Sequence, residues 1–165
     1  MTRLEDLSEE EIRRRAPVWT ALADLFLDTE PRESDLRFIS RTIREAGYTL
    51  LEAEDMLQFE VGPVFVWNLS VLGGVPSSGG RWYGWSEEEV CEKVISRLRQ
   101  PRLWERIPIW RDVGYGYQWS ACAPYWRQVR AYHAEGKAGD DAFFERKLAE
   151  SRGEDPHHIS PQTDK

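Results

Sequence analysis

The segment SEEEIRRRAPVWTALADLF, residues 8–26, predicts a helical beginning to the chain. Ser8 and Glu11 fit a capping box, in which each side chain accepts a hydrogen bond from a backbone N–H group at the helix start. Apolar residues then recur at the spacing of one buried helical face, at Val18, Leu22, Leu25 and Phe26. Pro17 either ends a short helical turn or takes the first position of a second helix.

The next part of the chain predicts two more helices. Ser34 can cap the first of them, and Gly47 can end it because glycine readily adopts the conformation of a helix C-cap. Thr49 and Glu52 form another capping box, and we expect the helix that follows them to end at Gly62-Pro63. Three amphipathic helices with short connections imply antiparallel neighbours around a common core.

The middle of the chain is less regular. Residues 64–71 are compatible with a short strand or with a buried helical turn, because the segment is rich in β-branched and aromatic residues. Residues 72–80 contain two Gly-Gly pairs and should form a loop. Ser86 and Glu89 form a third capping box, which predicts a helix directly behind the loop.

The C-terminal part predicts further helices. Residues 114–117, Gly-Tyr-Gly-Tyr, are expected to be irregular, and a helix should begin at Pro124 and end at Gly136. Asp140 or Asp141 can cap a last helix. Residues 154–165 have little to bury and should form a disordered tail.

These patterns together predict an all-α or nearly all-α fold. We expect a compact multi-helix bundle with an irregular middle segment rich in glycine and tryptophan. The 165 residues suit one domain, to which we assign residues 1–153.

The composition is that of a soluble globular protein, with 41% hydrophobic and 31% charged residues. The longest apolar run, Val64–Trp67, is too short to cross a bilayer, and the N-terminus lacks the apolar core of a secretory signal. We therefore expect a cytoplasmic protein. Cys91 and Cys122 lack the spacing of a zinc site or a disulfide framework, and each is expected to be a small buried residue.

Charge and tryptophan are unevenly distributed along the chain. The net charge is −7, which disfavours general binding to nucleic acid or to anionic membranes. Residues 1–66 hold 8 Lys/Arg against 15 Asp/Glu, whereas residues 67–135 hold 9 against 7. Seven of the eight tryptophans lie between Trp67 and Trp126. Tryptophan and arginine are enriched where proteins dock, so this distribution favours a binding function.

The sequence also carries a resemblance. The string RRAPVWTALADLFLDTE, residues 14–30, resembles the opening of a family of small, uncharacterised bacterial proteins. The resemblance extends over about residues 12–98 and includes Tyr48-Thr49-Leu50-Leu51-Glu52, Glu60-Val61-Gly62-Pro63, Asn68-Leu69 and Trp82-Tyr83-Gly84-Trp85. It implies a mainly helical bacterial domain of unknown function and supplies no catalytic residues. By this resemblance, residues 99–153 would be an aromatic extension.

Six residues are candidates for binding a partner: Trp82, Trp85, Asp28, Glu30, Glu60 and Asn68. The two tryptophans flank Gly84 and can anchor a partner or fold back over the core. Asp28 and Glu30 follow a helix end, where acidic residues are disfavoured, although a turn hydrogen bond would also explain them.

Glu60 and Asn68 also allow two interpretations each. Glu60 can point into a groove or lie on a solvated helix face, and the second is more frequent for glutamate. Asn68 lies in an apolar run and can be a buried, hydrogen-bonded structural residue.

No catalytic residue, metal site or cofactor is predicted. The glycine pairs are not followed by the residues of a phosphate-binding loop, and no serine lies in a nucleophile elbow. His133, His157 and His158 lack the spacing of metal ligands.

The expected function is therefore non-catalytic protein binding, most specifically an immunity-type protein that neutralises a bacterial toxin by occlusion. One alternative is a nucleic-acid accessory protein that uses the Arg/Trp segment 97–127, although those arginines can instead pair with acidic residues on a solvated face. A second is an enzyme with a pocket near the glycine-rich loop 72–85. A third is a structural oligomer with the tryptophan-rich half as its interface.

Overall fold

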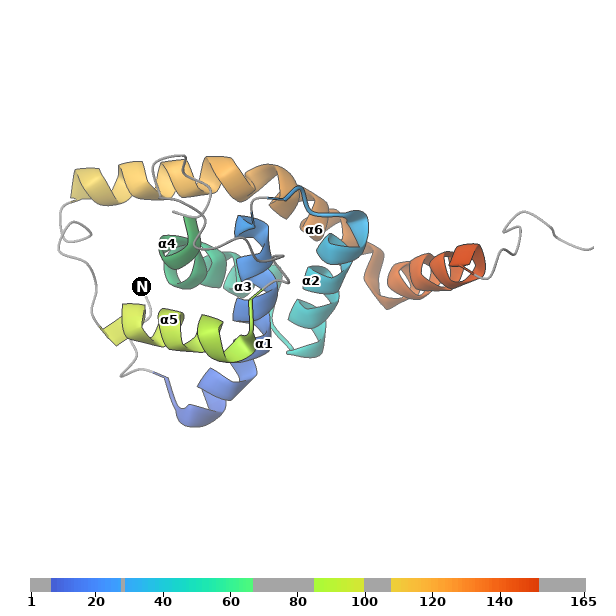
Figure 1. Ribbon diagram of the computed structural model, residues 1–165, viewed down its shortest axis with the longest axis horizontal. Coiled ribbons are helices and arrows are strands. Elements are labelled where there is room, and N and C mark those ends of the chain that lie inside the picture. Colours follow the sequence, from blue (N-terminus) through green and yellow to red (C-terminus); the bar gives the residue numbers. More distant parts are fainter. Residues whose placement is uncertain (1–6, 28, 67–84, 100–107, 152–165) are drawn as a thin grey trace, which may run out of the picture.

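In the computed structural model, residues 7–27, 29–66, 85–99 and 108–151 are described, and within these ranges the chain is helical with no strand. The prediction of an all-α fold is confirmed. The elements are shown in Figure 1 and are α1 (Glu9–Ala23), η2 (Asp24–Phe26), α2 (Glu33–Glu45), α3 (Leu50–Met56), η3 (Leu57–Val61), α4 (Gly62–Phe65), α5 (Glu87–Arg99) and α6 (Pro108–Ser151). The predicted loop 72–80 and the predicted tail 154–165 lie outside the described residues.

Helix α1 lies at the centre of the molecule, between α5, α2 and η3 (Figure 1). It begins where predicted, but with half of the predicted capping box: the Ser8 hydroxyl accepts a hydrogen bond from the backbone N–H of Glu11 at 3.1 Å, while the Glu11 carboxylate binds Arg15 and Tyr48. Its second half is buried on several sides at once, by Val18, Trp19, Ala21, Leu22 and Ala23. Because α1 packs against several neighbouring helices, the side chains that extend from it are held in fixed positions.

The helix α1 runs through Pro17, so both interpretations of this proline were wrong. Pro17 and Arg13 are both exposed. The carbonyl of Arg13, which loses its helical N–H partner, can therefore bond to water. Burial of Val18 and Trp19 directly after the proline outweighs the lost hydrogen bond.

The cap of helix α2 lies two residues earlier than the predicted cap at Ser34. Its N-cap is Arg32, whose backbone N–H donates to the carboxylate of Asp35 at 2.9 Å. The end is as predicted: Gly47 has φ of 74°, and hydrogen bonds from Gly47 to Arg44 and from Tyr48 to Ile43 complete a Schellman motif. The buried face is also as predicted, at Leu36, Ile39 and Ile43.

Helix α3 begins with the predicted capping box, in which Thr49 and Glu52 exchange hydrogen bonds at 2.8 and 3.2 Å. The predicted end at Gly62-Pro63 was wrong, because the chain continues through the π-helical segment η3 into α4. A π-helical turn shifts hydrogen bonding from the fourth to the fifth residue, which accommodates a proline ring beyond it. Residues 64–66 are therefore helical, not a strand.

Helix α5 begins at the predicted capping box, where Ser86 and Glu89 exchange hydrogen bonds at 3.2 Å. Helix α6 differs from the prediction because residues 114–117 are helical and the helix begins at Pro108, not at Pro124. Gly136 breaks α6 as expected, with φ of 71° and ψ of −166°. The helix resumes directly after Gly136, so Asp140 is not its cap.

All the described helices from α1 to α6 contribute to one hydrophobic core, to which α6 adds Cys122, Trp126 and Val129. The last part of α6 projects from the body beyond α2 (Figure 1). No helix in the described ranges has a segment long and apolar enough to cross a bilayer.

Candidate functional site

The carboxylate of Glu60 is only 1% exposed and lies where η3 packs against α1. Its Oε1 accepts a hydrogen bond from Arg15 Nη1 at 2.6 Å, and its Oε2 accepts one from Trp19 Nε1 at 2.6 Å. Both oxygens have a donor, and the guanidinium of Arg15 balances the buried negative charge. This group of three side chains joins the π-helical segment to the central helix.

The network continues from Arg15 to the surface. Tyr48 donates its hydroxyl proton to Glu11 Oε1 at 2.9 Å and accepts a hydrogen bond from Arg14 Nε at 2.9 Å. Burial opposes ionisation of Glu11, but hydrogen bonds from Arg15 and Tyr48 outweigh it and lower the pKa of Glu11. Arg14 stacks on the Tyr48 ring, with its guanidinium carbon 4.4 Å from the ring centroid.

The prediction that Glu60 binds a partner was wrong, and so was the alternative of a solvated glutamate. Leu57 and Val61 are buried on either side of it along the helix, which places Glu60 on the core-facing side. Because Glu60 is buried and each of its oxygens already accepts a hydrogen bond inside the protein, a partner has no access to its carboxylate. A buried ion pair of this kind stabilises or specifies packing.

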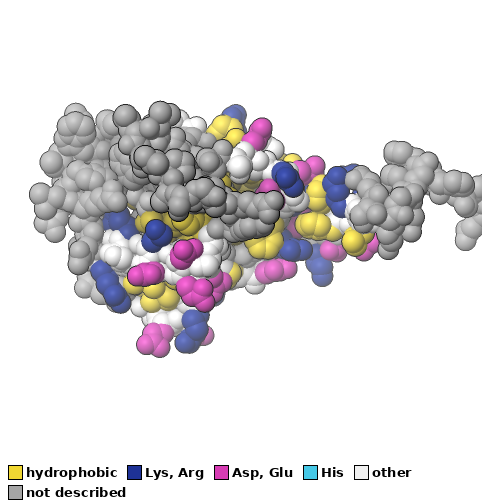
Figure 2. Space-filling model, in the orientation of Figure 1, with side chains coloured by type: hydrophobic (Ala, Val, Ile, Leu, Met, Phe, Trp, Pro, Cys, Tyr) yellow, Lys and Arg dark blue, Asp and Glu magenta, His cyan; other side chains and the backbone are white. Residues whose placement is uncertain are grey.

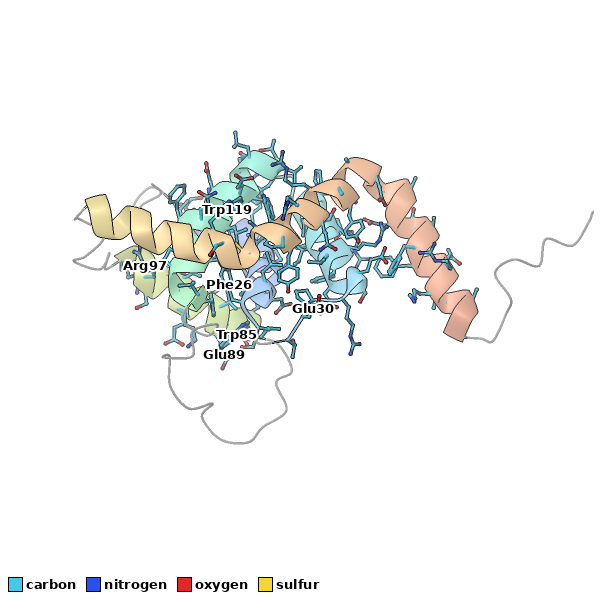
Figure 3. The ribbon with its side chains drawn as sticks, turned by 90° about the horizontal axis from the view of Figure 1, so that it is seen from above. Phe26, Glu30, Trp85, Glu89, Arg97 and Trp119 are labelled. Atoms are coloured by element: carbon cyan, nitrogen blue, oxygen red, sulfur yellow. The ribbon has the colours of Figure 1, made fainter. Side chains whose placement is uncertain are left out.

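Trp85 is partly buried and lies against the core. Its ring centroid is 5.0 Å from that of Phe65, and Lys93 Nζ lies 5.7 Å from the Trp85 ring. Figure 3 shows Trp85 next to Glu89, one helical turn along the beginning of α5. This placement favours the interpretation of Trp85 as a cover over the core, with the residue partly exposed.

The structure describes only some of the other predicted partner-binding residues. Glu30 is exposed, in the connection between η2 and α2 (Figure 3). Asp28, Asn68 and Trp82 lie outside the described residues. The structure therefore places Trp85 against the core and Glu60 within it, and leaves Glu30 exposed.

Asp24 is a partly buried acidic residue at the end of α1. Burial, together with the nearby charge of Asp35 on α2, raises the pKa of Asp24 to about 6. An unfolded aspartate has a pKa near 4, so the folded protein holds this proton more tightly. The resulting contribution favours the folded state below about pH 4 and is lost as the pH rises through about 6.

We predict that Asp24→Asn raises the free energy of unfolding by about 1 kcal/mol near neutral pH, less than the full pKa shift implies because Asp24 is partly solvated. Near pH 4 the gain should vanish, because Asp24 is then protonated in the folded protein. Urea denaturation at both pH values measures the effect, with the exposed Asp55→Asn as the control. A gain that persists at pH 4 would contradict the assignment.

A second charged group, the α2–α6 clamp, consists of Arg37, Arg44, Glu135 and Asp140. Asp140 is 1% exposed and accepts from Arg44 Nη1 at 2.9 Å, with Arg37 Nη1 at 3.5 Å from its other oxygen. Arg37 also donates to Glu135 at 2.8 Å. Its guanidinium carbon lies 4.2 Å from the Tyr132 ring centroid and 4.8 Å from that of Phe143.

Sequence reasoning missed this clamp. One signal was present, because Arg37 and Arg44 are seven residues apart and so share one face of α2. Their acidic partners on α6 lie 96 to 103 residues away in sequence. Spacing alone does not reveal such a contact.

Acidic side chains lie over α5 and the beginning of α1, interspersed with basic ones (Figure 2). The first turn of each helix holds three glutamates. The exposed ones are Glu9, Glu10, Glu87, Glu88 and Glu89. The two helices pack against each other, and carboxylates are favoured at helix N-termini, so this acidic face has a fixed scaffold.

The described residues offer little for nucleophilic or metal chemistry. Burial raises the pKa of the Cys122 thiol to about 11, which keeps it protonated at neutral pH. No group of three His, Cys, Asp or Glu side chains in the described ranges is placed to hold a metal ion. Arg97, expected on a groove or a solvated face, is instead buried.

Comparison with known protein families places the chain in a family. A family model described as Domain of unknown function (DUF7079) matches residues 13–132. The match runs past residue 98, where the resemblance ends, and so takes in most of α6 before Gly136. Neither a curated protein nor a solved structure matches the chain.

Proposed function

We propose that this chain, which belongs to the family of Domain of unknown function (DUF7079), is a non-catalytic protein-binding domain of the immunity type. It neutralises a bacterial toxin in the cytoplasm by covering the toxin's active site. The partner is a protein with a basic surface.

The observation that carries this proposal is the acidic face over α1 and α5. Five exposed glutamates lie in the first turns of two packed helices, at Glu9, Glu10, Glu87, Glu88 and Glu89. A rigid surface with an excess of one charge steers an oppositely charged partner and accelerates association, even where single basic residues lie among the acids. Toxins that act on nucleic acid carry such a basic site, since their substrate is a polyanion.

Trp85 can contribute to the same surface. It lies at the beginning of α5 beside Glu89, and packing against Phe65 holds its ring in place. A fixed aromatic ring next to charged residues loses little side-chain entropy when a partner covers it. The glutamates would set the association rate, and the exposed part of Trp85 would slow dissociation.

No described residue favours either alternative function over this one. The nucleic-acid alternative relied on segment 97–127, in which Arg97 is buried and residues 100–107 lie outside the description. The enzyme alternative relied on loop 72–85, of which the structure describes Trp85 alone.

The test is protection of bacterial cells that produce the toxin encoded beside this gene. The acidic-face variant combines Glu9→Gln, Glu10→Gln, Glu87→Gln and Glu88→Gln, which leaves the capping residues Glu11 and Glu89 in place. The control removes four exposed acids elsewhere, with Glu45→Gln, Asp55→Asn, Asp141→Asn and Glu145→Gln. Both variants change the net charge equally.

We expect the wild type and the control to restore growth and the acidic-face variant to protect poorly. With purified proteins at low salt, the acidic-face variant should associate at least about tenfold more slowly, and added salt should remove the difference. Absence of protection by the wild type, or equal association rates for the two variants, would refute the proposal.

A further inference from the structure

The break in α6 at Gly136 is a hinge that only glycine readily forms. Its φ of 71° and ψ of −166° lie in a region that residues with a side chain almost never adopt. A Cβ at this position would meet no atom within 4 Å, so the restriction comes from the backbone alone. Figure 3 shows that α6 changes direction where its colour passes from orange to red, so that the helix axis after the break differs in direction from the axis before it.

The part of α6 after the hinge, residues 137–151, is here called the strap. The clamp holds the strap on α2 through Asp140, and Phe143 lies beneath the Arg37 guanidinium. An isolated helix of this length is only marginally stable in water. The strap therefore depends on an α2 surface that supplies two arginines.

Nothing in these contacts requires that the strap and α2 belong to the same chain. The residues that meet are about a hundred positions apart, and one glycine sets the direction of the strap. A helical conformation at residue 136 would make α6 continuous and would direct the strap away from its own α2.

We propose that Gly136 is the hinge of a reciprocal domain exchange between two copies of this chain. In the monomer, the strap clamps α2 of its own chain. In the dimer, α6 is straight and each strap clamps α2 of the other copy through Asp140 and Phe143, while Glu135, which precedes the hinge, keeps its contact with Arg37 of its own chain. The α2 surface that a straight α6 leaves uncovered is filled by the strap of the second copy. The Asp140 carboxylate of that strap matches Arg44, and its Phe143 ring matches Arg37.

Residue 136 should control the balance between monomer and dimer. Gly136→Ala disfavours the bent conformation and favours a continuous helix, so both effects shift the chain toward the dimer. We expect the dimer association constant to rise at least about tenfold, measured by light scattering over a concentration series. Gly116→Ala is the matched control, because Gly116 lies within α6 with open space around it and no positive φ.

Charge exchange across the clamp tests whether the strap is swapped. Both charge variants are made in the Gly136→Ala background. Asp140→Arg places a third arginine beside Arg37 and Arg44, and Arg44→Asp places a second acid beside Asp140. Neither variant should therefore form the clamp within one chain or with an identical copy. In a mixed dimer, one strap meets its ordinary arginines and the other forms the reversed pair. We expect each chain alone to be monomeric and their mixture to dimerise, with helical content verified by circular dichroism.

Two results would overturn the proposal. The first is a Gly136→Ala protein that remains as monomeric as the Gly116→Ala control. The second is a mixture of the two charge variants that dimerises no more than each chain alone.

Discussion

Glu60→Ala is expected to lower the free energy of unfolding by about 3–5 kcal/mol, a large part of the stability of a domain of this size. The substitution leaves the guanidinium of Arg15 beside the core with Glu11 as its remaining carboxylate partner. It also leaves the Trp19 Nε1–H group without its acceptor in a fully buried position. Urea denaturation followed by circular dichroism measures the loss.

The loss of stability in Glu60→Ala arises mainly because one member of the Arg15–Glu60 pair is left without the other, and less because the ion pair itself is absent. Arg15→Met combined with Glu60→Met removes both charges and keeps apolar volume, so this double variant should recover the part of the loss that comes from the unpaired Arg15, while the cost of the unsatisfied Trp19 Nε1–H remains. Glu92→Ala, at an exposed site on α5, controls for the removal of a glutamate and should change stability by less than about 0.5 kcal/mol. A Glu60→Ala protein within about 1 kcal/mol of the wild type would contradict the role of this pair.

The beginnings of α1, α3 and α5 could be predicted because a helix cap is a local feature, whereas those of α2 and α6 differ from the prediction. Ser8, Thr49 and Ser86 each have a glutamate three residues later, and all three open a helix. The positive φ at Gly47 and Gly136 is local too, since glycine tolerates a conformation that other residues avoid.

The helix interiors could not be predicted where packing between residues distant in sequence determines the backbone conformation. Pro17, Gly62 and Gly116 each disfavour a helix locally, yet each lies within one. Around Pro17, the helix is stabilised by the burial of Trp19 and Leu22 against other helices. A prediction from local sequence does not include this contribution to the free energy of folding.

The charged groups were harder to predict than the helices. Glu60 was identified as a residue of interest, but its two donors lie 41 and 45 residues away in α1. The clamp joins α2 to a helix about a hundred residues later. A sequence shows which side chains carry charge, whereas burial and partner are set by how the helices pack.

Trp126→Ala is the second substitution with a large expected effect, again about 3–5 kcal/mol. Trp126 is 1% exposed and lies in the core, and its Nε1 donates to Glu54 on α3 at 2.8 Å. The substitution removes the largest side chain that α6 places in this core and leaves a cavity that rigid helices fill poorly. Gln128→Ala, at an exposed site two residues further along α6, is the control.

The way in which the Trp126→Ala protein unfolds carries further information about residues 99–153. The sequence suggested that they extend a smaller domain, and in that case damage at Trp126 would loosen α6 and leave α1 to α5 intact. The shared core argues otherwise, because Cys122, Trp126 and Val129 pack in one cluster with the buried residues of α1. We therefore expect hydrogen exchange to accelerate in α1 and α6 together, by about 100-fold or more for amides that open only on global unfolding. Faster exchange confined to α6 would show that the first five helices form a unit of their own.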